Sequence, residues 1–174
     1  IPPREVVTII NTYFEAMSAA IMSHHGLVLQ YIGDEIEAVF GAPVALENHQ
    51  QCAIEAALEM RTRLSQVNLN LANQGFPALR HGIGLHTGKV VAANIGSTQR
   101  LSYAMVGETV NIASRIQELN KGFDTDILIS DAVRQSLDRS IEMNPLSPVP
   151  VKGIGEPLHL FSIGKQPFVC VGSI

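Results

Sequence analysis

A carboxylate pair directly follows a glycine between two apolar runs of the sequence. The segment LQYIGDEIEAVFGAP, residues 29–43, places Asp34 and Glu35 after Gly33. Gly-Asp is also ordinary turn chemistry, because glycine adopts positive φ and aspartate hydrogen-bonds to its own backbone. A carboxylate at a hairpin tip nevertheless stays accessible, and Mg²⁺ is usually held by one or two carboxylates together with substrate phosphates. Asp34 is therefore a candidate metal ligand, with turn formation as the alternative.

A second polar group lies in the segment TVNIASRIQEL, residues 109–119. Asn111 and Arg115 are four residues apart, and Val110, Ala113 and Ile116 recur at helical spacing on another side. Residues four apart on a helix share a face, so these two side chains can reach one ligand. The alternative is a solvated polar face.

Hydrophobic periodicity predicts the elements that position these groups. Helical spacing covers residues from Pro3 to about Gly26, 48–71, 109–119 and 131–137. Strand-like runs cover 27–32, 35–40, 81–96 with a turn at Thr87-Gly88, 101–106, 125–130 and 158–163, and three prolines between 145 and 150 predict a stiff connection. Because helices separate hairpins instead of alternating with single strands, we expect an α+β fold with a mixed or antiparallel sheet covered by helices.

The composition indicates one globular domain without the basic footprint of a nucleic-acid binder. The chain has 174 residues, 46% of them hydrophobic, and a net charge of −4. Its two cysteines cannot build a disulfide framework, which favours a reducing, cytoplasmic environment. No apolar run approaches the roughly 20 residues of a membrane span, so we expect no membrane contact by this domain. This expectation does not extend to a membrane tether in a longer parent protein. The first residue is Ile1, which suggests a fragment of something longer.

Two stretches resemble the catalytic domain of class III nucleotidyl cyclases, the adenylate and guanylate cyclase family. One is the hairpin segment YIGDEIEAVFGAP, and the other is residues 84–120, GLHTGKVVAANIGSTQRLSYAMVGETVNIASRIQELN. The most specific match is the run Val-Gly-x-Thr-Val-Asn-x-Ala-Ser-Arg, and VKGIGEPLHLFSI, residues 151–163, resembles the closing segment of the family. We therefore expect the catalytic domain to cover residues 1–164, followed by a tail, 165–174, without an assigned role.

The resemblance implies a ferredoxin-like fold and a head-to-tail homodimer whose active sites are shared between two chains. The implied reaction converts a nucleoside triphosphate, ATP in the favoured reading, to cyclic AMP and pyrophosphate in signal transduction. Asp34 would be one of two aspartates that hold two Mg²⁺ or Mn²⁺ ions per site. Asn111 would orient the ribose, Arg115 would stabilise the α-phosphate in the transition state, and Lys152 would meet the β- and γ-phosphates.

The sequence departs from the family pattern at several positions. The other metal-binding aspartate belongs to a strand before the first predicted helix, which we expect in the parent protein. The two base-selecting positions carry Gln30 and Ala104: glutamine can donate and accept hydrogen bonds, and alanine can do neither. Gly82 occupies a position where the family often has a phosphate-contacting arginine, for which Arg80 and His81 are the candidate substitutes. A guanylate cyclase and an inactive cyclase-like regulatory or dimerisation domain therefore remain alternatives, and ATP is preferred because adenylate cyclases are commoner among bacterial-looking members.

Other polar residues are given structural explanations. The side chains of His24 and His25 are expected near the terminal carbonyls of the first helix, and His86 is read as structural. Glu35 and Glu37 alternate on one face of their strand and are expected to form a solvated edge.

Overall fold

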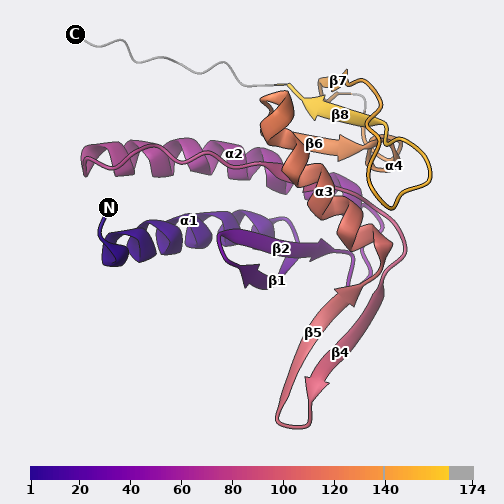
Figure 1. Cartoon of the computed structure of the whole chain (residues 1–174), viewed down its shortest axis with the longest axis horizontal. Helices are drawn as coiled ribbons and strands as arrows, with labels where there is room; N and C mark the ends of the chain where they lie inside the picture. Colours follow the sequence, from indigo (N-terminus) through magenta and orange to yellow (C-terminus); the bar gives the residue numbers. More distant parts are fainter. Residues whose placement is uncertain (139, 165–174) are drawn as a thin grey trace.

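Three long helices, two hairpins and a four-stranded sheet make up the computed structural model, which describes residues 1–138 and 140–164 (Figure 1). The helices are α1 Pro3–Ser23, α2 His49–Asn73, α3 Glu108–Phe123 and the short α4 Asp131–Arg134. The strands are β1 Gly26–Ile32, β2 Glu35–Phe40, β3 Ile83–Leu85, β4 Val91–Ser97, β5 Arg100–Val106, β6 Ile127–Ser130, β7 Met143–Pro145 and β8 Leu160–Ile163. The expected α+β class is confirmed, and the tail 165–174 lies outside the described residues.

The strands form three separate groups. The order β3-β6-β8-β7 makes the main sheet, in which β3 runs parallel to β6 and the other pairs are antiparallel. β1 pairs with β2, and β4 pairs with β5, as two antiparallel hairpins. The expected short helix and the predicted hairpin at Gly33-Asp34 are both present.

The prediction of paired strands within residues 81–96 is wrong. β3 takes a parallel partner, β6, whereas β4 pairs with the next strand along the chain. The turn at Ser97 favours this second pairing, because the Ser97 hydroxyl accepts hydrogen bonds from the backbone N–H groups of Gln99 and Arg100. β3 is also pressed against α3: a Cβ on Gly84 would lie 2.4 Å from the backbone nitrogen of Gln117. The predicted proline-stiffened connection also differs, because Met143–Pro145 forms edge strand β7.

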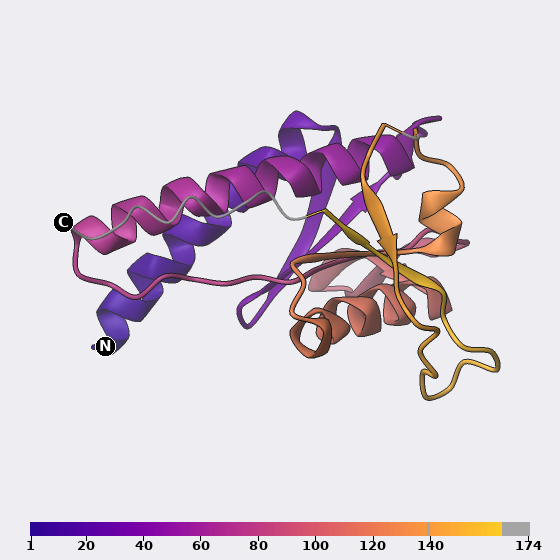
Figure 2. The same cartoon turned by 90° about the horizontal axis from the view of Figure 1, so that it is seen from above.

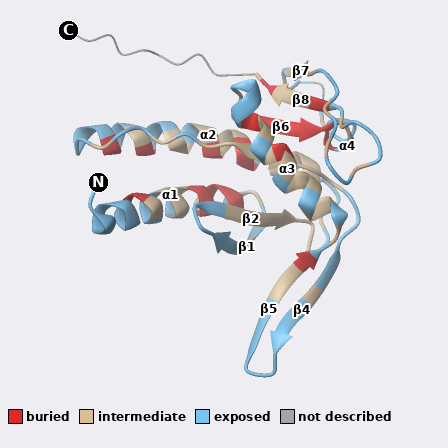
Figure 3. Cartoon of the chain, in the orientation of Figure 1, coloured by how far each residue is buried: buried red, intermediate tan, exposed pale blue. Residues whose placement is uncertain are grey.

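The core lies where the helices meet the strands (Figure 3). Met17, Ala20 and Ile21 of α1 pack with Met60 of α2 and with the inner face of the first hairpin. Residues of β6, α2, α4 and β8 form a second cluster around Ile129. Figure 2 shows how α1 and α2 extend beyond the strands from this common core.

α1 is long and apolar enough to cross a membrane by length and composition alone, which corrects the expectation that no segment approaches that length.

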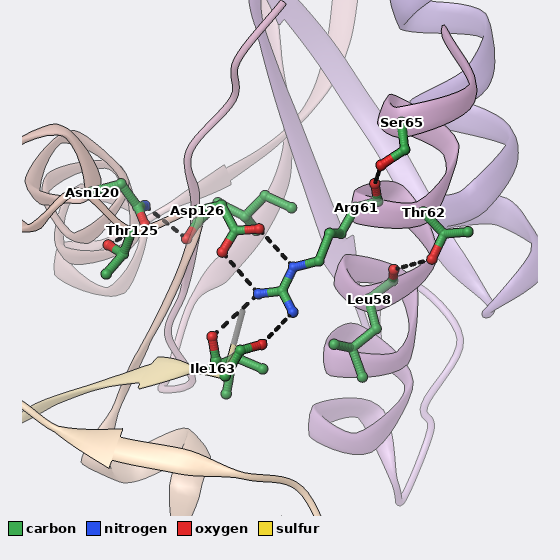
Figure 4. Close-up of polar contacts among 10 residues, drawn as sticks. Leu58, Arg61, Thr62, Ser65, Asn120, Thr125, Asp126 and Ile163 are labelled. Carbon is green, nitrogen blue, oxygen red and sulfur yellow. Dashed lines mark hydrogen bonds and ion pairs between the residues drawn. The ribbon is translucent and has the colours of Figure 1, made fainter. Parts of the chain in front are cut away.

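A largely buried arginine links α2 to the main sheet (Figure 4). Arg61 donates hydrogen bonds from Nε and Nη2 to the Asp126 carboxylate at 2.6 and 2.8 Å. Its Nη1 and Nη2 atoms also donate to the backbone carbonyls of Gly164 and Ile163. One guanidinium thus joins α2, the start of β6 and the end of β8, elements distant in the sequence.

Candidate active site

Asp34 occupies the exposed turn between β1 and β2, where Gly33 has a φ of +62°. Together with residues of β2, β3 and α3, it lines a cleft of about 840 Å³ that also contains Tyr13, His81 and Asn111. Asp34 is therefore accessible to a cation, as the sequence suggested.

Tyr13 and His81 form a polar pair in this cleft. The Tyr13 hydroxyl lies 3.2 Å from His81 Nδ1, and His81 Nε2 is buried without a hydrogen-bond partner among the described residues. Burial lowers the pKa of His81 to about 4. Burial, with a further contribution from the charge of Asp34, raises the pKa of Tyr13 to about 12. Both groups are neutral at physiological pH.

The suggested replacements for the phosphate-contacting arginine do not agree with this geometry. A neutral His81 supplies no positive charge for a phosphate. Arg80 is already paired with Asp124, with its Nη2 2.7 Å from the carboxylate, at an exposed position. We find no support for either residue as the missing phosphate ligand.

The cleft separates two strands with unpaired edges. Within residues 1–138 and 140–164, β2 pairs only with β1, and β3 pairs only with β6, although both strands line the cleft. No group of three or more metal-ligating side chains occurs in this part of the chain. Asp34 thus has room beside it, and the other carboxylates of the described residues that line this cleft, Glu35 and Glu37, do not form a metal-binding group of three with it.

Arg115 lies beside the loop that carries Lys152, on another part of the surface. The Arg115 guanidinium lies beside Gly153, with Nη1 and Nη2 3.8 and 3.9 Å from the position a Cβ would take there. A turn holds this loop, because the Ile154 N–H donates to the Val151 carbonyl at 3.1 Å. The half-buried Arg115 therefore lies against the loop that carries the exposed Lys152.

Asn111 lies one helical turn before Arg115 and is exposed in the first turn of α3. It lines the cleft of Asp34, whereas neither Arg115 nor Lys152 is among the described residues that do so. Arg115 and the loop of Lys152 thus lie next to each other, and neither of these two side chains lines the cleft of Asp34.

The two positions expected from the sequence to select the base, Gln30 and Ala104, lie on different hairpins. Gln30 is exposed on β1, and its Nε2 donates a hydrogen bond to Glu37 Oε2 at 2.5 Å. Ala104 lies on β5 opposite Ala93 of β4. The expectation that Glu37 only forms a solvated edge is therefore wrong, because its carboxylate has a side-chain partner. Counting outward from the two-residue turn pairs Gln30 with Glu37, so the sequence contained this signal.

The structural explanations for the histidines are partly confirmed. His86 Nδ1 lies 2.8 Å from the Ser130 hydroxyl, so this contact links the end of β3 to the end of β6. Burial lowers the pKa of His86. His24 contacts carboxylates instead of terminal carbonyls: its Nε2 lies 2.6 Å from Glu59 Oε2 on α2. Arg63 and, to a smaller extent, His24 hold the pKa of Glu59 below its usual value.

Comparison with known proteins places this geometry in a family. The sequence model described as the adenylate and guanylate cyclase catalytic domain matches residues 1–164. Adenylate cyclase 1 of Rhizobium meliloti is 34% identical over 161 residues, which cover 92% of this chain and 24% of the relative. An adenylate cyclase of Anabaena cylindrica is 32% identical over 168 residues, covering 92% of this chain and 32% of that protein. The chain therefore spans about a quarter to a third of these relatives.

Solved structures show the same fold. The guanylyl cyclase Cya2 aligns with a TM-score of 0.87 at 32% identity, covering 97% of this chain and 86% of that one. The adenylyl cyclase CyaB from P. aeruginosa aligns with the same TM-score and coverage at 21% identity, a likeness of fold alone. Sequence and structure together show that the chain belongs to the adenylate and guanylate cyclase catalytic-domain family.

Proposed function

We propose that this domain converts ATP to cyclic AMP and pyrophosphate at a site shared between two copies of the chain. The observation that carries the proposal is the separation of Asp34 from Arg115 and Lys152 within one chain. Arg115 lies beside Gly153, in the loop that carries Lys152, while Asp34 lines a different surface, the cleft between β2 and β3. A second chain that brings its Asp34 to the first chain's Arg115 would complete the set.

A candidate surface for this association is the hairpin of β4 and β5, which projects from the rest of the molecule (Figure 1). Val91, Ile95, Leu101 and Val106 expose apolar side chains on it. Exposed apolar residues gathered on one element are typical of protein–protein contacts. This supports the proposed homodimer.

Asp34 would hold one side of a pair of Mg²⁺ or Mn²⁺ ions. Its exposed carboxylate suits a hard cation, and the second carboxylate would come from a further strand between the unpaired edges of β2 and β3. When bound, the ions lower the pKa of the ribose 3′-hydroxyl and neutralise charge on the phosphates.

The remaining roles belong to side chains of α3 and the Gly153 loop. Asn111 offers an amide that both donates and accepts, which suits the ribose. The Arg115 guanidinium would stabilise the charge that develops on the α-phosphate as pyrophosphate leaves, and Lys152 would hold the outer phosphates. Arg115 is half-buried in the chain itself, which strengthens its electrostatic contribution.

The choice of ATP is supported by the two curated relatives named adenylate cyclase. Guanylate cyclase activity is the second candidate, favoured by the likeness to Cya2 at 32% identity and by Ala104, which offers no side-chain hydrogen bond to a base. We further propose that the domain is the cytoplasmic output module of a longer signalling protein.

The test is product formation by the chain extended upstream through the proposed strand, supplied with Mn²⁺ and either ATP or GTP. We expect cyclic AMP from ATP, and we expect Asp34→Ala to abolish it. Cyclic GMP as the main product would show that the substrate is GTP, and the proposed type of reaction would stand. No product from a folded, dimeric protein would overturn the proposed catalysis in favour of an inactive regulatory domain.

A further inference from the structure

Gln30 and Glu37 face each other across the first hairpin. The two-residue turn at Gly33-Asp34 sets them as direct cross-strand partners, and Gln30 Nε2 donates to Glu37 Oε2 at 2.5 Å. Directly opposite residues on antiparallel strands have Cβ atoms about 5 Å apart, so the backbone holds the pair in contact.

The neighbouring pair fixes which face of the hairpin Gln30 occupies. Tyr31 stacks on Phe14 of α1 with ring centroids 4.4 Å apart, and its hydroxyl lies 2.9 Å from Ser18 Oγ. Ile36, opposite Tyr31, packs in the same core. Because successive residues of a strand point to opposite faces, Gln30 and Glu37 are directed away from α1.

The chemistry of Glu37 determines which end of the Gln30 amide is free. A carboxylate only accepts hydrogen bonds, so the NH₂ group of Gln30 must face it. The carbonyl oxygen of Gln30 is then the end that remains for a ligand. An unassisted glutamine could present either end.

We propose that Glu37 is a positioning residue for base selection, holding the Gln30 amide so that the site presents a hydrogen-bond acceptor to the purine. This inference rests on the proposed function and on the family resemblance, which implies that Gln30 lies at the base. The group that Gln30 reads is then an N–H donor of the base, the 6-amino group in the case of ATP. A purine without such a donor is disfavoured, because it meets a fixed carbonyl oxygen.

The first experiment detects the contact in the protein without substrate. Side-chain amide signals of Gln30 in ¹⁵N-labelled protein, identified by their loss in Gln30→Ala, report the hydrogen bond to Glu37. We expect Glu37→Gln to shift these signals and to speed their exchange with water. Glu35→Gln is the matched control, because Glu35 pairs with Ile32 in the hairpin register and should leave them unchanged.

The second experiment compares turnover of the natural nucleotide with that of purine riboside triphosphate, whose base has no N–H donor. We expect the wild-type protein, extended upstream as above, to prefer the natural nucleotide. We expect Glu37→Gln to lower the ratio of kcat/KM for the natural nucleotide to kcat/KM for purine riboside triphosphate by about three- to tenfold. The reason is that a neutral partner lets the Gln30 amide turn its NH₂ group toward the base. Glu35→Gln should keep the wild-type ratio.

The outcomes separate the inference from the proposed function. Gln30 signals that are unmoved by Glu37→Gln, or an unchanged nucleotide ratio, would overturn the positioning role while leaving a working cyclase. No product from either nucleotide would overturn the proposed function and the base-reading role with it, and the amide signals would still report the contact.

Discussion

Replacing Arg61 tests how far one buried guanidinium stabilises the fold. Its side chain is 11% exposed, that of Asp126 is 27% exposed, and Arg61 also binds two backbone carbonyls. Arg61→Met keeps most of the aliphatic volume but leaves the carboxylate and both carbonyls without these donors. Removing one partner of a buried pair costs about 3–5 kcal/mol. Because Asp126 is partly exposed, we expect a loss of about 2–4 kcal/mol in the free energy of unfolding.

The chain contains a matched control for this prediction. Arg80 and Asp124 form an ion pair whose side chains are 82% and 76% exposed, and such pairs contribute about 0–1 kcal/mol. Urea unfolding should therefore show a much smaller loss for Arg80→Met than for Arg61→Met. Adding Asp126→Asn to Arg61→Met should restore part of the stability, because the unpaired carboxylate is removed. Equal losses for Arg61→Met and Arg80→Met would refute the reasoning.

Two further predictions concern the residues of the cleft and of α3. The ordinary pKa of His81 is 6.5 and its folded value is about 4, so its neutral form stabilises the fold above pH 6.5, and stability falls as the pH drops from 6.5 to about 4. This contribution to the free energy of unfolding is at most about 3 kcal/mol. In a plot of unfolding free energy against pH, His81→Gln should flatten the slope between pH 6.5 and about 4. Identical slopes for the wild type and His81→Gln in this range would contradict the account. Arg115→Ala should lower kcat of the active enzyme by about 10²-fold or more with a much smaller change in KM, because its contact strengthens in the transition state. A raised KM with unchanged kcat would instead make Arg115 a residue of ground-state binding.

Local patterns in the sequence predicted most of the elements that carry the site. Spacing of apolar residues located α1, α2 and α3, and the Gly33-Asp34 turn between apolar runs located the hairpin. These signals work because each depends on neighbours in the chain. The same signals placed Asn111 and Arg115 on one helix.

Such local patterns could not predict contacts between residues that are far apart in the sequence. The parallel partner of β3 is β6, which follows after two strands and a helix, and strand composition does not encode that choice. Arg61 and Asp126 are likewise far apart in the sequence, and a charged residue on an amphipathic helix is usually solvated. The neutral state of His81 also depends on burial by α1, which the local sequence does not reveal.

The most direct test of the shared site mixes two inactive variants of the complete domain. Asp34→Ala removes the proposed metal carboxylate, and Arg115→Ala removes the proposed transition-state cation from the other half of the site. Random pairing of equal amounts yields heterodimers with one intact site, so cyclic nucleotide formation should recover to about a quarter of the wild-type rate. No recovery, with heterodimers demonstrated in the mixture, would contradict a site built from two chains.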